Sequence, residues 1–116
     1  MAEPIFKICG AEEWAQALES GVYRGSAADL ADGFIHFSTG AQLAGTAARH
    51  FAGRRDLVLA AVDPDRLGPE LRWEPARRGD LFPHLYGHMP VSAVLWHRPL
   101  PLGPDGVHSL PAEPAR

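Results

Sequence analysis

The chain has 116 residues and a formal net charge of −3, with 46% hydrophobic and 22% charged residues. This length and composition are typical of a single soluble globular domain that needs neither disulfides nor metal ions, and they exclude a disordered chain. The negative charge argues against a general polyanion binder, because phosphate neutralisation dominates nucleic-acid affinity. We therefore expect no DNA partner, and RNA is not favoured either.

Compartment signals point to the cytoplasm. Cys9 is the one cysteine, so no internal disulfide can form, which fits a reducing environment. The N-terminal residues lack the basic region and apolar stretch of a signal peptide, and no segment reaches membrane-spanning length. We expect a cytoplasmic protein without a membrane partner, and the sequence leaves its oligomeric state open.

An apolar strand and an amphipathic helix open the chain. Residues 4–9 are mainly apolar and predict a strand. Residues 11–20 predict a helix, because Glu12 and Glu13 fall in the first turn, where the helix dipole favours acidic residues. Gly21 is suited to end this helix.

A loop, a strand and a second helix follow. Residues 22–33 are rich in Gly, Ser and Asp and predict a loop. Residues 34–38 predict a strand, and residues 40–53 predict a helix that Ser38 or Thr39 can cap.

The second half of the chain predicts three more strands. Residues 56–64 form a continuous apolar run, which is typical of a central strand buried on both faces. Residues 70–75 predict a short strand and residues 91–100 the last one. Between them, residues 76–90 predict a long loop that carries aromatic residues and histidines.

This order of elements predicts one α+β domain over residues 1–100, with a mixed, twisted sheet and two main helices. Residues 101–116 contain four prolines and predict a mobile tail. Its removal is expected to leave stability nearly unchanged.

The strand at residues 34–38 places a histidine among apolar side chains. Successive side chains of a strand point to opposite faces. If Ile35 and Phe37 face the core, His36 and Ser38 point together to the other side. Such a histidine is either a core residue satisfied by one hydrogen bond or a polar group in a cleft.

The strand at residues 70–75 repeats this pattern, with Leu71 and Trp73 on one face and Arg72 and Glu74 on the other. We therefore expect polar groups of both strands to line one cleft, although most polar residues on strands are merely exposed. The candidate catalytic residues are His36 and Glu74. The candidate ligand-binding residues are Tyr23, Arg24, Ser26, Ser38, Thr39, Arg72, His84 and Tyr86.

Several uncommon words of the sequence resemble one family in order and spacing. They are "GVYRGSAADLADGFIHFST", "LVLAAVD", "LRWEPARRG" and "LFPHLYG", within residues 5–100. They resemble the small bacterial domain-of-unknown-function 952 family. The resemblance implies an ADP-ribosylation fold, like that of ADP-ribosyltransferases. A weaker similarity, in "IHFS", "AQLAGTAARHF" and "LVLAAVD", extends to the RNA 2'-phosphotransferases of that superfamily.

This resemblance also implies a function, namely a pocket for a small ligand or a nucleotide, with NAD as the candidate cofactor. In such a site His36 would hold the ribose, Ser38 and Thr39 would shape the pocket, and Tyr23 or Tyr86 would stack on the base. Glu74 would stabilise the positive charge that develops on the sugar carbon in ADP-ribosyl or related glycosidic transfer.

Three other readings remain open. The first is a module that binds a ligand without catalysis. The second is an acid–base enzyme that uses His36 and Glu74 without a cofactor. The third is a metal-dependent enzyme that uses His84 and His88, which are spaced H-x-x-x-H. Because prolines and a glycine surround these histidines, a regular helix is not expected there, and we predict no metal site.

Overall fold

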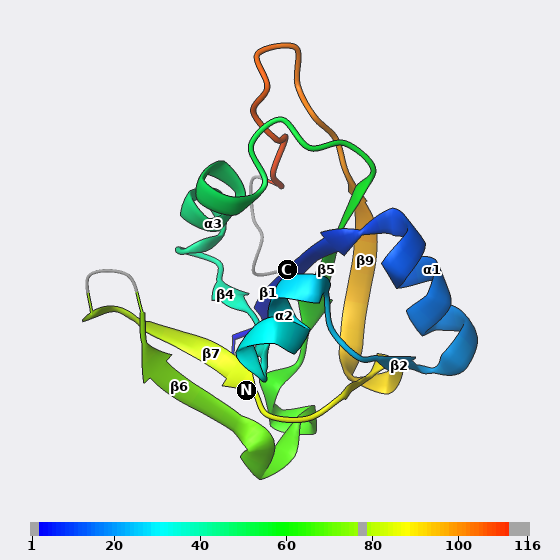
Figure 1. Cartoon of the computed structure of the whole chain (residues 1–116), viewed down its shortest axis with the longest axis vertical. Coiled ribbons are helices and arrows are strands. Elements are labelled where there is room, and N and C mark those ends of the chain that lie inside the picture. The colour runs from blue at the N-terminus through cyan, green and yellow to red at the C-terminus, as the bar shows by residue number, and fades with distance from the viewer. Residues whose placement is uncertain (1–2, 77–78, 112–116) are drawn as a thin grey trace.

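The computed structural model describes residues 3–76 and 79–111, which form one α+β domain with three α-helices (Figure 1). The strand pairings of these residues are all antiparallel. The α+β class is therefore confirmed, but the mixed sheet is wrong. The strands before and after the second main helix, β4 (Ser38–Thr39) and β5 (Leu57–Val62), do run in the same direction. They are not paired with each other, because β1 (Ile5–Gly10) lies between them and is antiparallel to both.

A four-stranded sheet with the order β4-β1-β5-β9 forms the centre. Its strands are β1 (Ile5–Gly10), β4 (Ser38–Thr39), β5 (Leu57–Val62) and β9 (Val94–Leu100). All six residues of β5 are buried, which confirms the prediction of a central strand.

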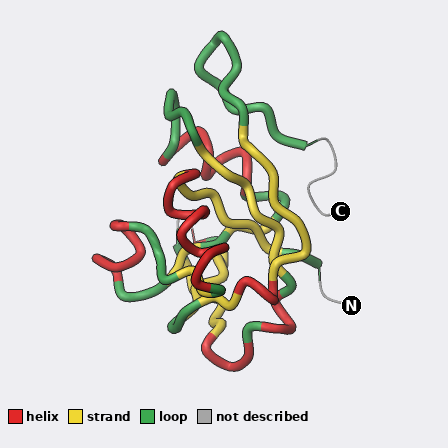
Figure 2. The backbone as a smooth tube through the Cα atoms, turned by 90° about the vertical axis from the view of Figure 1, so that its right-hand side faces the viewer, coloured by secondary structure: helices red, strands yellow, loops and turns green. Residues whose placement is uncertain are grey.

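The two expected helices, α1 (Ala11–Ser20) and α3 (Leu43–His50), cover opposite faces of this sheet (Figures 1 and 2). Trp14 of α1 packs with Cys9 and Val58 in one core cluster. Leu43 of α3 packs with Phe6 in the other. Because neighbouring residues of β1 and β5 point to opposite faces, each strand contributes to both cores.

A three-stranded sheet with the order β3-β7-β6 projects from this centre (Figure 1). It contains β3 (Ile35–His36), β6 (Leu71–Pro75) and β7 (Leu81–Leu85). Ile35 and Leu85 lie opposite each other and bury one face of this sheet in the core cluster of α1. Its other face is turned outward.

The predicted loop at residues 76–90 is wrong, because it contains β7 and also β8 (Met89–Pro90). Pro83 is unusual within a strand, since it cannot donate a backbone hydrogen bond. In β7, the Pro83 carbonyl accepts from the Phe37 N–H, where the chain leaves β3. A residue of an antiparallel strand directs its nitrogen and its carbonyl to the same neighbour. The nitrogen of Pro83 therefore faces the side where the pairing of β7 with β3 has ended, so no N–H donor is needed there.

The predicted loop at residues 22–33 also contains regular structure, namely β2 (Val22–Tyr23) and α2 (Ala27–Asp32). The Ser26 side chain accepts from Asp29 N–H, while Asp29 accepts from Ser26 N–H, which is a capping box. Gly33 ends α2 in the left-handed conformation, with φ of 88°. Ser26, Asp29 and Gly33 are therefore cap residues of a short helix, and the prediction of a loop without regular structure at residues 22–33 is wrong.

The short 3-10 helices η1 (Pro64–Arg66), η2 (Gly68–Glu70) and η4 (Val91–Ala93) connect strands. None of the helices in the described part of the chain is long and apolar enough to span a bilayer.

Residues 101–111 pack against the domain. Leu102 and His108 form an isolated bridge, and His108 is buried with its Nε2 2.8 Å from the Arg54 carbonyl oxygen. Leu110 packs on the core cluster beneath α3. The sequence did not indicate these contacts, because proline content alone suggested a segment that buries little.

We therefore expect truncation after Leu100 to lower the melting temperature by about 5 °C or more, since a buried hydrogen bond and apolar contacts are lost. A chain that ends at Pro111 keeps these contacts and serves as the reference in the same thermal unfolding measurement. Equal melting temperatures for the two chains would restore the view of residues 101–111 as an unpacked tail.

Candidate functional site

A row of polar side chains crosses the outward face of the three-stranded sheet. His36 of β3 lies opposite His84 of β7, which in turn lies opposite Arg72 of β6. Directly opposed residues share a face of the sheet, and Glu74 shares it by strand alternation. His36 and Glu74 therefore lie on one face of the sheet, as the strand alternation predicts, while their roles in a shared site stay a prediction.

A buried carboxylate anchors one end of this row. Asp29 Oδ1 lies 2.6 Å from His36 Nδ1 and also accepts from the His36 backbone N–H at 3.1 Å. Lys7 Nζ lies 2.8 Å from Asp29 Oδ2 and donates to the His36 carbonyl oxygen at 3.0 Å. The side chains of Lys7 and Asp29 are only 5% and 2% exposed, so this ion pair is shielded from solvent.

The partners of Asp29 decide its charge. Burial by itself would raise the pKa of Asp29, but the hydrogen bond from His36 and the nearby Lys7 ammonium hold that pKa well below its usual range. Asp29 is therefore a carboxylate, and a carboxylate can only accept hydrogen bonds. It follows that His36 carries a proton on Nδ1.

A second carboxylate–histidine pair lies at the other end of the row. Glu74 Oε1 lies 2.8 Å from His84 Nδ1 and accepts from the Tyr86 hydroxyl at 2.7 Å. These hydrogen bonds, from His84 first and Tyr86 second, lower the pKa of Glu74. The same hydrogen bond to Glu74 raises the pKa of Tyr86. Glu74 is thus a fixed, ionised carboxylate at the protein surface.

Aromatic rings connect the two pairs. The Phe34 ring stacks on His84 with centroids 4.1 Å apart and contacts His36 at 4.5 Å. The ring centroids of Phe34 and Tyr86 are 5.2 Å apart. The Arg72 guanidinium carbon lies over the Tyr86 ring, 5.0 Å from its centroid. The name polar face is used below for His36, His84, Tyr86, Arg72 and Glu74 with Phe34.

Ser38 does not share the polar face, so that expectation is wrong. Ser38 is buried, and its hydroxyl lies 2.7 Å from that of Thr46 in α3. The strand period fails because the chain passes from β3 in one sheet to β4 in another at Phe37. Side-chain alternation applies only within one regular strand.

The remaining predicted residues lie away from the polar face or serve the fold. Tyr23 is buried in the core, where burial, with Cys9 second, raises the pKa of its hydroxyl. Ser26 caps α2, and Arg24 is exposed in the preceding turn. The Thr39 hydroxyl accepts from the Gln42 N–H before α3. Burial raises the pKa of the Cys9 thiol to about 12, consistent with an inert core residue.

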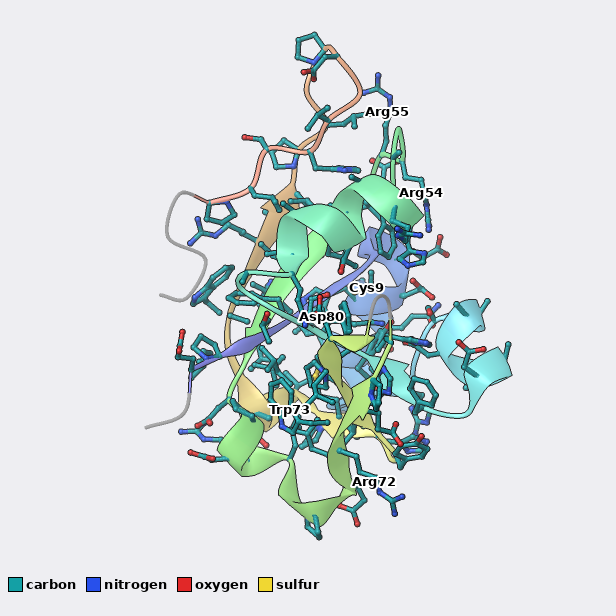
Figure 3. All side chains as sticks on the ribbon, turned by 90° about the vertical axis from the view of Figure 1, so that its left-hand side faces the viewer. Cys9, Arg54, Arg55, Arg72, Trp73 and Asp80 are labelled. Atoms are coloured by element: carbon teal, nitrogen blue, oxygen red, sulfur yellow. The ribbon has the colours of Figure 1, made fainter. Side chains whose placement is uncertain are left out.

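A hollow of about 450 Å³ lies on the opposite side of β6. It is lined by Leu71 and Trp73, which alternate with Arg72 and Glu74 along the strand. Figure 3 shows Trp73 and Arg72 on opposite sides of β6. Thr39 also lines it, whereas His36 and Glu74 do not. The catalytic candidates therefore stand on an open face rather than in this hollow.

No group of three or more metal-ligating side chains suited to an ion occurs in residues 3–76 and 79–111. His88 is exposed, while His84 is buried and engaged with Glu74. The H-x-x-x-H spacing therefore does not bring these two histidines into one cluster.

Two residues central to the site escaped the sequence analysis. Lys7 is the sole lysine of the chain and lies within an apolar strand, which could have signalled a buried ion pair. Asp29 falls within the loop predicted at residues 22–33, and its local sequence gives no sign of burial. Its burial depends on Lys7 of β1, 22 residues earlier in the chain, as well as on nearby β3.

Replacing Asp29 by Asn should lower the free energy of unfolding by about 3–5 kcal/mol, because it leaves Lys7 buried without its counter-charge. The double variant Lys7→Met, Asp29→Asn should recover much of this loss. Urea unfolding of the wild type and both variants measures the effect. A single variant within about 1 kcal/mol of the wild type would show that the pair is not strongly coupled.

The pH dependence follows from the lowered pKa of Asp29. The unfolded carboxyl titrates near pH ~4, so the stability that it provides is present above this pH and is lost as the pH falls through the folded pKa. The wild type should therefore lose more stability between pH 7 and pH 3 than the double variant does.

Comparisons with known proteins agree with the motifs. The family model described as "Protein of unknown function (DUF952)" matches residues 8–97. The crystal structure of protein CC0527 from Caulobacter crescentus is 48% identical, with a TM-score of 0.88 over 91% of this chain and 93% of that one. The solution NMR structure of CC0527 is 49% identical, with a TM-score of 0.80 over 90% of each chain.

A search of curated proteins finds no match. The family assignment thus rests on the model match and on the solved structures, and it confirms the resemblance of the motifs to this family. The chain belongs to the DUF952 family of proteins of unknown function.

Proposed function

We propose that the polar face binds a nucleotide-like small molecule, with NAD as the first candidate, and that the chain carries out ADP-ribosyl or a related glycosidic transfer. The observation that carries this proposal is the Glu74 carboxylate, fixed by His84 and Tyr86 on the same face as His36. When a base leaves a ribose, positive charge develops at the sugar carbon. A preorganised carboxylate stabilises that charge without reorganising.

The ADP-ribosyltransferase-like fold implied by the motifs belongs to this proposal. It supplies the reason for choosing NAD, since the known relatives are described only as proteins of unknown function or by a locus name. The element order β3, α3, β5 and β6, with His36 in β3 and Glu74 in β6, is similar to the order expected from that resemblance and supports the proposal.

The other groups of the polar face suit a nucleotide. Tyr86 is 38% exposed and can stack on a base, whereas buried Tyr23 cannot reach one without rearrangement. Arg72 is exposed beside Tyr86 and can donate to a phosphate. His36 is partly exposed and would hold the ligand before and during the reaction. Ser38 can act only indirectly, through the packing of α3.

A second candidate is acid–base chemistry by His36 without a nucleotide cofactor. The 2.6 Å contact between Asp29 Oδ1 and His36 Nδ1 favours it, because a buried carboxylate that orients an imidazole is a common catalytic arrangement. In this candidate Glu74 would only position His84.

Substitution of Glu74 and of His36 should separate binding from turnover. Glu74→Gln should keep the affinity for NAD within a few-fold and lower turnover about a hundredfold, because the amide keeps the shape and loses the charge. His36→Ala should weaken binding. Calorimetry with NAD, ADP-ribose and AMP measures affinity, and release of nicotinamide measures turnover.

Glu19→Gln, on the exposed end of α1, is the matched control and should leave both quantities unchanged. Thermal unfolding of each variant shows whether a loss reflects folding. Wild-type protein that neither binds these ligands nor releases nicotinamide would refute the proposal, and turnover that depends on His36 but not on Glu74 would favour the second candidate.

A further inference from the structure

The outer nitrogen of His36 is covered by a carboxylate of the same chain. His36 Nε2 lies 2.8 Å from Asp32 Oδ2, in the last residue of α2. The Asp32 side chain is 56% exposed, in contrast to the 2% exposure of Asp29 at the inner nitrogen. One imidazole is thus held between a buried carboxylate and a surface carboxylate.

The charges of this cluster favour an oxygen anion at the outer nitrogen. His36 can satisfy both carboxylates only as imidazolium, which donates from both nitrogens. Lys7 already compensates the charge of Asp29 in the interior. An anionic oxygen outside, at Nε2, would therefore balance the positive charge of that imidazolium.

Of the carboxylates near His36 and His84, that of Asp32 can turn away with the smallest loss of hydrogen bonds. Asp29 also accepts from Lys7 and from backbone N–H groups, and Glu74 accepts from two side chains. The contact that the structure gives to the Asp32 carboxylate is the one with His36. A negative charge at a helix C-terminus is moreover unfavourable for the helix, so the fold itself does not call for an aspartate there.

We propose that Asp32 occupies the place of a ligand phosphate, and that the site takes a phosphate-bearing ligand whose oxygen accepts from His36 Nε2 when Asp32 turns into solvent. This rests on the proposed function and narrows it, since it assigns the phosphate of the nucleotide, rather than a neutral ribose, to His36. Arg72 lies two strands away in the same cross-strand row and supplies a second cationic group.

Binding of inorganic pyrophosphate tests this assignment. Asp32→Ala removes the competing carboxylate and should bind pyrophosphate at least about tenfold more tightly than the wild type, because two like charges near one site repel strongly. Asp65→Ala makes the same change of net charge at an exposed aspartate of η1, and should stay within about twofold of the wild type. Calorimetry gives the affinities, and the side-chain ¹⁵N resonances of His36 report contact at Nε2.

The gain should disappear when His36→Gln is added to Asp32→Ala, with thermal unfolding as the check that the double variant is folded. An affinity of Asp32→Ala no higher than that of Asp65→Ala overturns the assignment, as does a gain that survives without His36. If the double variant does not fold, unchanged His36 Nε2 resonances in Asp32→Ala with pyrophosphate overturn it equally.

The two proposals can fail separately. Pyrophosphate binding at His36 without nicotinamide release would support the phosphate assignment and refute the transfer reaction. Nicotinamide release with an affinity for pyrophosphate that does not respond to Asp32 would do the reverse.

Discussion

The buried ion pair between Lys7 and Asp29 connects parts of the molecule that no backbone ladder joins. Lys7 projects from the central sheet, Asp29 caps α2, and both hold the backbone of β3 through His36. Removing either charge would leave the other in the interior, where an uncompensated charge is costly. The orientation of His36 relative to the central sheet is thus determined by electrostatics as much as by packing.

This arrangement leaves the domain with two unlike surfaces on one small sheet. Ile35 and Leu85 are buried in the core, so the neighbouring positions, His36 and His84, must face outward. The hollow beside Trp73 belongs to the inner side of β6, and the ionised Glu74 carboxylate belongs to the outer side. A chemical role for the outer side does not require a deep pocket, because its groups are fixed by one another.

Each histidine of the polar face has its Nδ1 next to a carboxylate oxygen, yet the two pairs differ in character. Asp29 is sealed in the interior and fixes a proton on His36, whereas Glu74 is accessible and is itself fixed by His84 and Tyr86. A buried orienting group and an exposed reacting group are the two parts that a catalytic site needs. In the proposed function the polar face combines these two parts, which are separated by only one strand.

The sequence by itself determined the elements whose signals are local. The apolar run of β5, the acidic first turn of α1 with Gly21 behind it, and the alternation of Leu71, Arg72, Trp73 and Glu74 need no distant partner to be interpreted. The motifs likewise determined the family, because they occur in a fixed order along the chain.

Only the tertiary structure decided the features that depend on distant pairing. Pro83 is tolerated in β7 because the chain leaves β3 opposite it. Ser38 does not share the face of His36 because the chain changes from one sheet to another at Phe37. The charge environment of His36 required Lys7, 29 residues earlier in the chain, to meet Asp29. Local periodicity reports which way a side chain points within one element, but the energy of a buried charge depends on what the rest of the fold places beside it.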